Sequence, residues 1–119
     1  MKLYELTQKL DSLIKEKQFI ELKATYILNE IKGTPLNNLN RELQKVEKLK
    51  REIDLSNKEI DKYFAKIDEV LKSNFDTIDI KIFTLKKYKN LSFEKVAELI
   101  NYSPRQTQRR YKKIMDFEL

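Results

Sequence analysis

The chain has 119 residues, about the length of one domain, and contains only one glycine and two prolines. Charged residues make up 37% of the sequence, and the net charge at pH 7 is +6, which favours anionic partners. The absence of cysteine and histidine excludes disulfides, thiolate metal sites and imidazole bases. We expect an all-α protein, because sheets need many turns rich in Gly and Pro, and we expect no enzyme activity, cofactor or metal.

Two long amphipathic helices are predicted in the first 72 residues. Apolar residues recur there at alternating spacings of three and four, with a polar residue at occasional steps. The seam of the first helix is Leu3, Leu6, Leu10, Leu13, Lys17, Ile20, Ala24, Ile27 and Ile31, and that of the second is Leu39, Leu43, Val46, Lys50, Ile53, Asn57, Ile60, Phe64, Ile67 and Leu71.

The two helices are separated by Gly33-Thr34-Pro35. Glycine can take the left-handed conformation that ends a helix, and proline cannot continue one, so we expect a tight turn here. A connection of only about residues 32–38 favours an antiparallel hairpin.

A pair of helices shields only one narrow stripe, so the hairpin needs a third surface. This surface is supplied by the C-terminal domain, a second copy or another protein, and we expect a homodimer or higher homo-oligomer. Lys50 and Asn57 either fix the register of the seam or lie at its edge with their polar ends in water.

The aromatic residues occur at helical spacing, which predicts core packing rather than stacking on bases. In the hairpin these residues are Tyr4, Phe19, Tyr26, Tyr63 and Phe64, and in the C-terminal part they are Phe83, Phe93, Tyr102 and Tyr111.

Three further helices are predicted after the hairpin. Asn74, Asp76 and Thr77 can start the first, which Asn90 interrupts. Its inner face is Ile78, Ile82, Leu85 and Tyr88 or Lys89. Ser92 is the expected N-cap of a short helix over residues 93–100, with Val96, Ala97 and Ile100 buried.

The last helix is predicted from Pro104 to Met115. Asn101 tolerates the left-handed conformation that ends the preceding helix. Ser103 and Gln106 have the spacing of a capping box, and Pro104 falls at the first helical position. A helix, a short turn and a second capped helix form the helix-turn-helix arrangement, in which the second helix enters the major groove of DNA.

Polar and basic side chains gather on the outer side of this last helix. Arginine can pair with guanine, glutamine with adenine, and lysine with phosphate. The inner side is expected to hold Thr107, Tyr111, Ile114 and Leu119 or Glu118. The predicted DNA-binding residues are Ser103, Arg105, Gln106, Gln108, Arg109, Lys112 and Lys113.

Charge supports a division into an interaction hairpin, residues 1–73, and a DNA-binding domain, residues 74–119. Residues 2–73 carry 15 basic and 13 acidic side chains, whereas residues 74–119 carry 10 basic and 6 acidic ones.

Apolar runs stay far below the ~20 residues that span a bilayer, and residues 1–10 do not resemble a signal peptide. We therefore expect a cytoplasmic protein without membrane contact.

The stretch 91–107, LSFEKVAELINYSPRQT, resembles the helix-turn-helix of small phage and prophage transcription regulators of the ArpU and RinA type. It is also similar to the promoter-reading final domain of bacterial sigma factors. The shared pattern is an aromatic-acidic pair, an aliphatic-Ala pair, a Gly-Tyr-Ser turn and Arg-Gln followed by an aliphatic residue. Asn101 replaces the usual Gly, and Thr107 replaces the usual aliphatic.

The resemblance implies that the ligand is double-stranded promoter or operator DNA and that RNA polymerase is a further partner. The leading hypothesis is thus a sequence-specific regulator of phage or mobile-element genes. Two alternatives remain: a helical interaction or inhibitor protein without DNA binding, and a subunit like the small terminases of DNA packaging.

Overall fold

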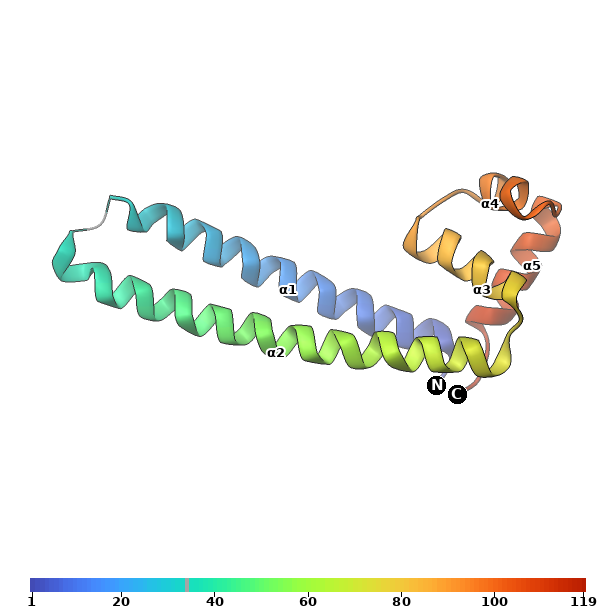
Figure 1. Ribbon diagram of the computed structural model, residues 1–119, viewed down its shortest axis with the longest axis horizontal. Coiled ribbons are helices and arrows are strands. Elements are labelled where there is room, and N and C mark those ends of the chain that lie inside the picture. The colour runs from blue at the N-terminus through green and yellow to red at the C-terminus, as the bar shows by residue number, and fades with distance from the viewer. Residues whose placement is uncertain (34) are drawn as a thin grey trace. The chain divides into compact units, whose positions relative to one another are not determined.

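The computed structural model describes residues 1–33 and 35–119, and the side chains of residues 36 and 37 also lie outside the description. The described elements are helices (Figure 1). They are α1 (Leu3–Ile31), α2 (Leu36–Asn74), α3 (Thr77–Phe83), the π-helix η1 (Thr84–Tyr88), α4 (Phe93–Ile100) and α5 (Pro104–Met115). The predicted all-α class is confirmed, and none of the described helices is long and apolar enough to cross a membrane.

The chain forms two compact units, and the first is the hairpin of residues 9–64. In it α1 and α2 lie side by side and run antiparallel, as predicted (Figure 1). The seam buries Leu10, Ala24, Val46 and Ile60, while most other predicted seam residues are half-buried. The contact between the helices is therefore a narrow stripe.

The seam of α2 departs from the prediction at two positions. Leu43 is exposed, and Leu49 is half-buried where Lys50 was expected. Lys50 is exposed, which agrees with the reading that it lies at the edge of the stripe, and Asn57 is half-buried.

The expectation that the hairpin aromatics all pack inside is wrong. Tyr4, Phe19 and Tyr26 are exposed, whereas Tyr63 and Phe64 are half-buried. Helical spacing alone did not separate the two groups, because Phe19 and Tyr26, seven residues apart, share a stripe of α1 that lies beside the seam rather than on it.

The turn does not use Gly33 as expected. Its φ is not positive, and its N–H donates to the carbonyl of Glu30 at 3.1 Å. The helix thus ends without a left-handed glycine, and Thr34, the centre of the predicted turn, lies outside the described residues.

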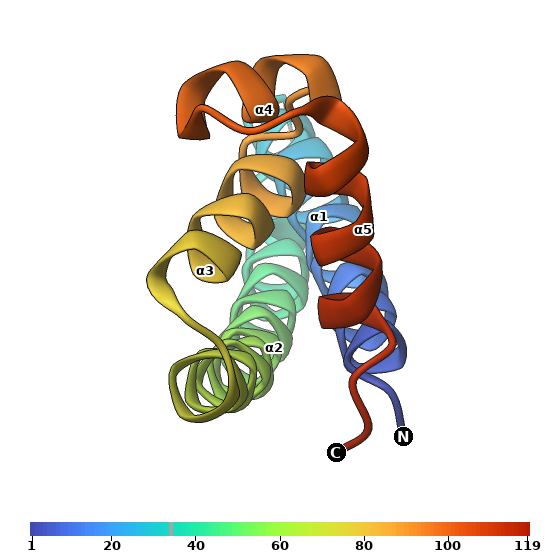
Figure 2. The ribbon, with the colours of Figure 1, turned by 90° about the vertical axis from the view of Figure 1, so that its right-hand side faces the viewer.

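The second unit joins residues 1–8 to residues 65–119. The amide of Leu3 donates to the carbonyl of Phe117 at 2.9 Å, and that of Leu119 donates to Met1 at 2.8 Å. The two ends of the described chain accordingly lie side by side (Figures 1 and 2). The Phe75 and Phe117 rings meet edge to face, with centroids 5.2 Å apart. Residues 1–8 and 65–73 thus pack with the part of the chain that we expected to begin at residue 74.

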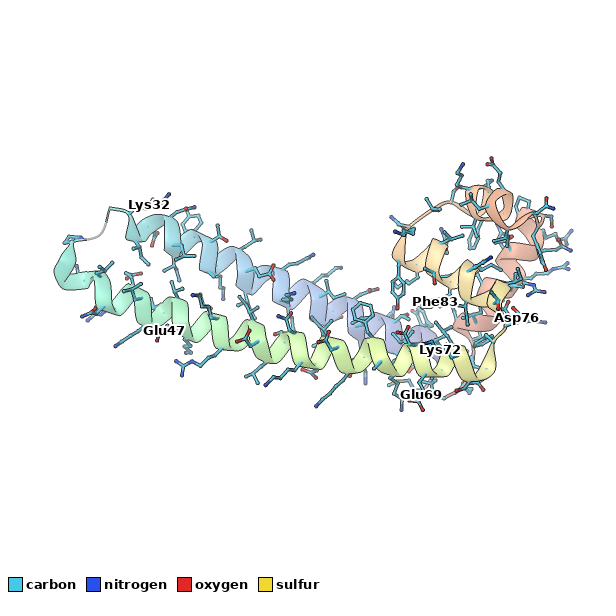
Figure 3. All side chains as sticks on the ribbon, viewed as in Figure 1. Lys32, Glu47, Glu69, Lys72, Asp76 and Phe83 are labelled. Carbon is cyan, nitrogen blue, oxygen red and sulfur yellow. The ribbon has the colours of Figure 1, made fainter. Side chains whose placement is uncertain are left out.

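This unit has one apolar core. It buries Leu3, Leu6, Ile67, Leu71, Ile82, Phe83, Val96, Ala97 and Ile114, of which Phe83 is labelled in Figure 3. Within the unit α3 and α5 run beside each other and α4 lies across their ends (Figure 2).

The π-helix after α3 was not predicted. The amide of Lys89 donates to Thr84, five residues back, at 3.1 Å, and the Thr84 hydroxyl donates to Ile80 at 2.8 Å. The wider turn brings the Tyr88 ring against Phe83, with centroids 5.4 Å apart. The element ends at Tyr88 with Lys89 as its C-cap, and Asn90 follows with φ of 54°.

The helix-turn-helix is formed by α4 and α5, at the predicted bounds. Ser92 caps α4 by accepting from the amide of Lys95 at 3.2 Å. Asn101 ends α4 in the left-handed conformation, φ 61° and ψ 42°, and the amide of Tyr102 donates back to Ala97 at 3.0 Å.

The left-handed turn yields a stability prediction. Asn101→Val places a β-branched residue at φ 61°, and we expect it to lower the free energy of unfolding by about 1–2 kcal/mol. Asn101→Gly, which removes the steric conflict, leaves stability near that of the parent. Urea unfolding followed by circular dichroism distinguishes the two; equal losses in both variants contradict this account of the turn.

Candidate nucleic-acid interface

The outer face of α5 presents the side chains that the sequence predicted for DNA. Arg105, Arg109 and Lys112 follow one another at steps of four and three, so they share one side of the helix. Lys113 and Gln108 flank them. All of the predicted site residues are exposed: Ser103, Arg105, Gln106, Gln108, Arg109, Lys112 and Lys113.

The inner face of α5 determines which side is left outside. Thr107 and Ile114 are fully buried, and the Thr107 hydroxyl is satisfied by the carbonyl of Ser103 at 2.9 Å. Tyr111 meets Phe93 of α4 edge to face at 5.6 Å. We expected Leu119 or Glu118 on the inner face, and this is wrong, because α5 ends at Met115.

Arg110 is the one cation of α5 that turns inward. Its guanidinium lies 3.1 Å from a carboxylate oxygen of Asp79, on the first turn of α3, and 3.5 Å from one of Asp76, just before that turn. It also covers the ring of Tyr102, 5.1 Å from the centroid. Partial burial acts to lower the pKa of Arg110, but the hydrogen bond to Asp79 and the neighbouring charges raise it overall. Arg110 is thus a structural link rather than a free cation.

Asp76 is the N-cap of α3, at the start of that helix (Figure 3). Its carboxylate accepts from the amide of Asp79 at 2.8 Å. This hydrogen bond is the largest effect that lowers the pKa of Asp76; desolvation opposes it, and the charge of Arg110 adds to it.

The capping box of α5 restricts two of the predicted DNA contacts. The Gln106 amide oxygen accepts from the backbone N–H of Ser103, while the Ser103 hydroxyl accepts from the N–H of Gln106, each at 3.2 Å. Pairing with adenine through both amide atoms would therefore break the cap. Gln108 carries no such bond among the described residues, so it is the better candidate for reading a base.

Some basic side chains of this unit contact a carbonyl, a ring or a carboxylate of the chain, whereas others have no carboxylate partner among the described residues. Lys86 donates to the carbonyl of Leu91 at 3.1 Å and covers the Phe93 ring, and Lys95 pairs with Glu98. In the described part of the chain, no carboxylate pairs with the four remaining cations of α5, and α5 itself has no acidic residue. These free cations are Arg105, Arg109, Lys112 and Lys113.

No family model, curated protein or solved structure matches this chain. Among the described residues, no group of three carboxylates lies close enough together to hold a metal ion. The outer surface of α5 is therefore the candidate functional site.

The Asp76 site yields a prediction on pH. Because the pKa of Asp76 is lower in the folded chain, its charge stabilises the fold above the ordinary pKa of 3.8, and this contribution is lost as the pH falls through the lowered value. Asp76→Asn keeps an N-cap and removes the charge beside Arg110. We expect a lower melting temperature than the parent at pH 7, with the difference closing below about pH 4.

The control is Asp68→Asn, on an exposed part of α2, which should follow the parent at every pH. If the difference in melting temperature between Asp76→Asn and the parent persists unchanged at pH 2, the charge of Asp76 does not contribute to that difference.

Proposed function

We propose that the chain is a DNA-binding protein that inserts α5 into the major groove of double-stranded DNA. The observation that carries the proposal is a capped helix, set after a left-handed turn, whose outer face has four free cations and no carboxylate. A solvated surface helix usually carries both signs of charge, as α1 and α2 do.

The side chains of α5 have different proposed roles. Arg105, near the N-terminus of the helix, and Arg109, one turn later, donate to guanine edges or phosphates. Gln108 lies beside them and pairs with adenine, and Lys112 and Lys113 neutralise phosphates farther along. Ser103 and Gln106 hold the helix start, and of their side-chain donors only the amide nitrogen of Gln106 stays unused by the cap, so they contribute less to base reading.

The biological role follows from the resemblance of residues 91–107 to phage and prophage regulators. We propose sequence-specific regulation of phage or mobile-element genes in the cytoplasm, with RNA polymerase as a further partner and no catalytic step. Because one small helix-turn-helix covers few base pairs, two copies on neighbouring half-sites would strengthen binding.

A second candidate, a helical protein-interaction module without DNA binding, is favoured by one observation. The hairpin exposes large apolar side chains, among them Phe19, Leu22 and Tyr26. Such a protein would bind its partner with little dependence on salt, whereas DNA binding through α5 weakens steeply as salt rises.

The test is fluorescence-anisotropy titration of the full chain with duplexes from upstream of its own and neighbouring genes. We expect saturable binding to one duplex that weakens with salt. The double variant Arg105→Ala, Arg109→Ala should lose more than tenfold in affinity and reduce the slope of log K against log salt by up to about two.

The matched control is Lys58→Ala, Lys62→Ala, which removes the same charge from two exposed positions four residues apart on α2. It should bind like the parent. Equal weakening of both double variants would point to net charge alone, and a double Arg variant that binds like the parent would refute reading by α5.

A further inference from the structure

One face of the hairpin carries an apolar groove of about 670 Å³ that α1 and α2 line together. The apolar lining comes mainly from α1, where Phe19, Leu22 and Tyr26 are 59%, 68% and 72% exposed. Leu49 of α2 lies beside them. Lys23, Lys48 and Glu52 also line the groove, which lies within the hairpin unit.

Along the groove face of α2, basic side chains precede Lys50 and acidic side chains follow it at the same distances in sequence. Arg41 and Glu59 lie nine residues before and after it, and Lys48 and Glu52 lie two residues before and after it. Steps of seven and four residues keep these four side chains on one side of the helix. The half of the face toward the turn is therefore basic, and the other half is acidic.

The groove face of α1 repeats this arrangement about Phe19. Glu16 lies three residues before it and Lys23 four residues after it, on the same side of the helix. Phe19 and Leu49 line the same groove, so the two charge patterns share one centre. Because the helices are antiparallel, Lys23 lies toward the turn, like Lys48.

We propose that a second copy of the chain packs on this face, antiparallel to the first, with the two-fold axis perpendicular to the helices and crossing them at the level of Phe19 and Lys50. Arg41 then meets Glu59 of the second copy, and Lys48 meets its Glu52. This inference does not depend on DNA binding by α5.

The orientation follows from the same charges. In a parallel pairing α1 of one copy covers α2 of the other at the same level, which sets Glu16 against Glu52 and Lys23 against Lys48. Like charges in contact disfavour this arrangement, whereas the antiparallel one opposes unlike charges at every one of these positions.

The face is large enough for a dimer. From Arg41 to Glu59 it is ~27 Å long at 1.5 Å per residue, and two helices are ~20 Å wide. The product, roughly 540 Å² of flat area on a corrugated surface, is of the order of the ~800 Å² of accessible surface that each partner buries in a standard interface. Phe19, Leu22 and Tyr26 would lie at its centre, where aromatic anchors contribute most.

The first test is sedimentation equilibrium of the full chain without DNA. We expect a dimer, and we expect Phe19→Gln to raise its dissociation constant at least tenfold. Leu28→Gln is the matched control, because Leu28 is an exposed leucine of α1 that does not line the groove, and it should sediment like the parent. Circular dichroism checks that both variants keep the parent's helicity.

The decisive test is a charge exchange on α2. Arg41→Glu and Glu59→Arg, each alone, should raise the dissociation constant by about tenfold, and the double variant should restore it. Within one chain the two positions are ~27 Å apart, beyond the ~8 Å screening length of physiological salt, so restoration can come only from a second copy. A monomer at all concentrations, a dimer indifferent to Phe19→Gln, or a double variant no better than the singles overturns the proposal.

Discussion

The ion pair between Arg110 and Asp79, 3.1 Å long, helps to set the rotation of α5 about its own axis. Arg110, Thr107 and Ile114 share the inner side of the helix, so turning α5 would break the ion pair and expose two buried side chains. With that side held inward, the remaining cations of α5 face outward together. The contacts of the inner side therefore determine which side chains of α5 form the candidate DNA surface.

Local signals in the sequence were sufficient to predict the helix-turn-helix. Ser92, Asn101, Ser103 and Pro104 each act on the backbone within a few residues, by accepting an amide hydrogen bond, adopting φ of 61° or starting a helix without an N–H. The bounds of α4 and the start of α5 follow from these residues alone. The exposed positions on α5 follow from the helical period once the bounds are known.

Contacts between distant residues were not predictable in the same way. The pairing of Leu3 with Phe117 and the link from Arg110 to Asp76 and Asp79 join positions with no shared local pattern. The π-helix η1, which brings the Tyr88 ring against Phe83, likewise follows from no local pattern that we used. The opposite charges on either side of Lys50 were visible in the sequence of α2. Without the hairpin structure they could not be distinguished from an ordinary helix surface of mixed charge.

We propose DNA binding by α5, within the unit of residues 1–8 and 65–119, and self-association through the hairpin of residues 9–64. These two surfaces share no residue. The most direct measurement of the central claim is chemical-shift mapping by ¹H–¹⁵N NMR of the full chain, titrated with a bound duplex. We expect the largest changes at the amides of residues 103–113; changes confined to residues 9–64, or none at all, would contradict DNA binding by α5.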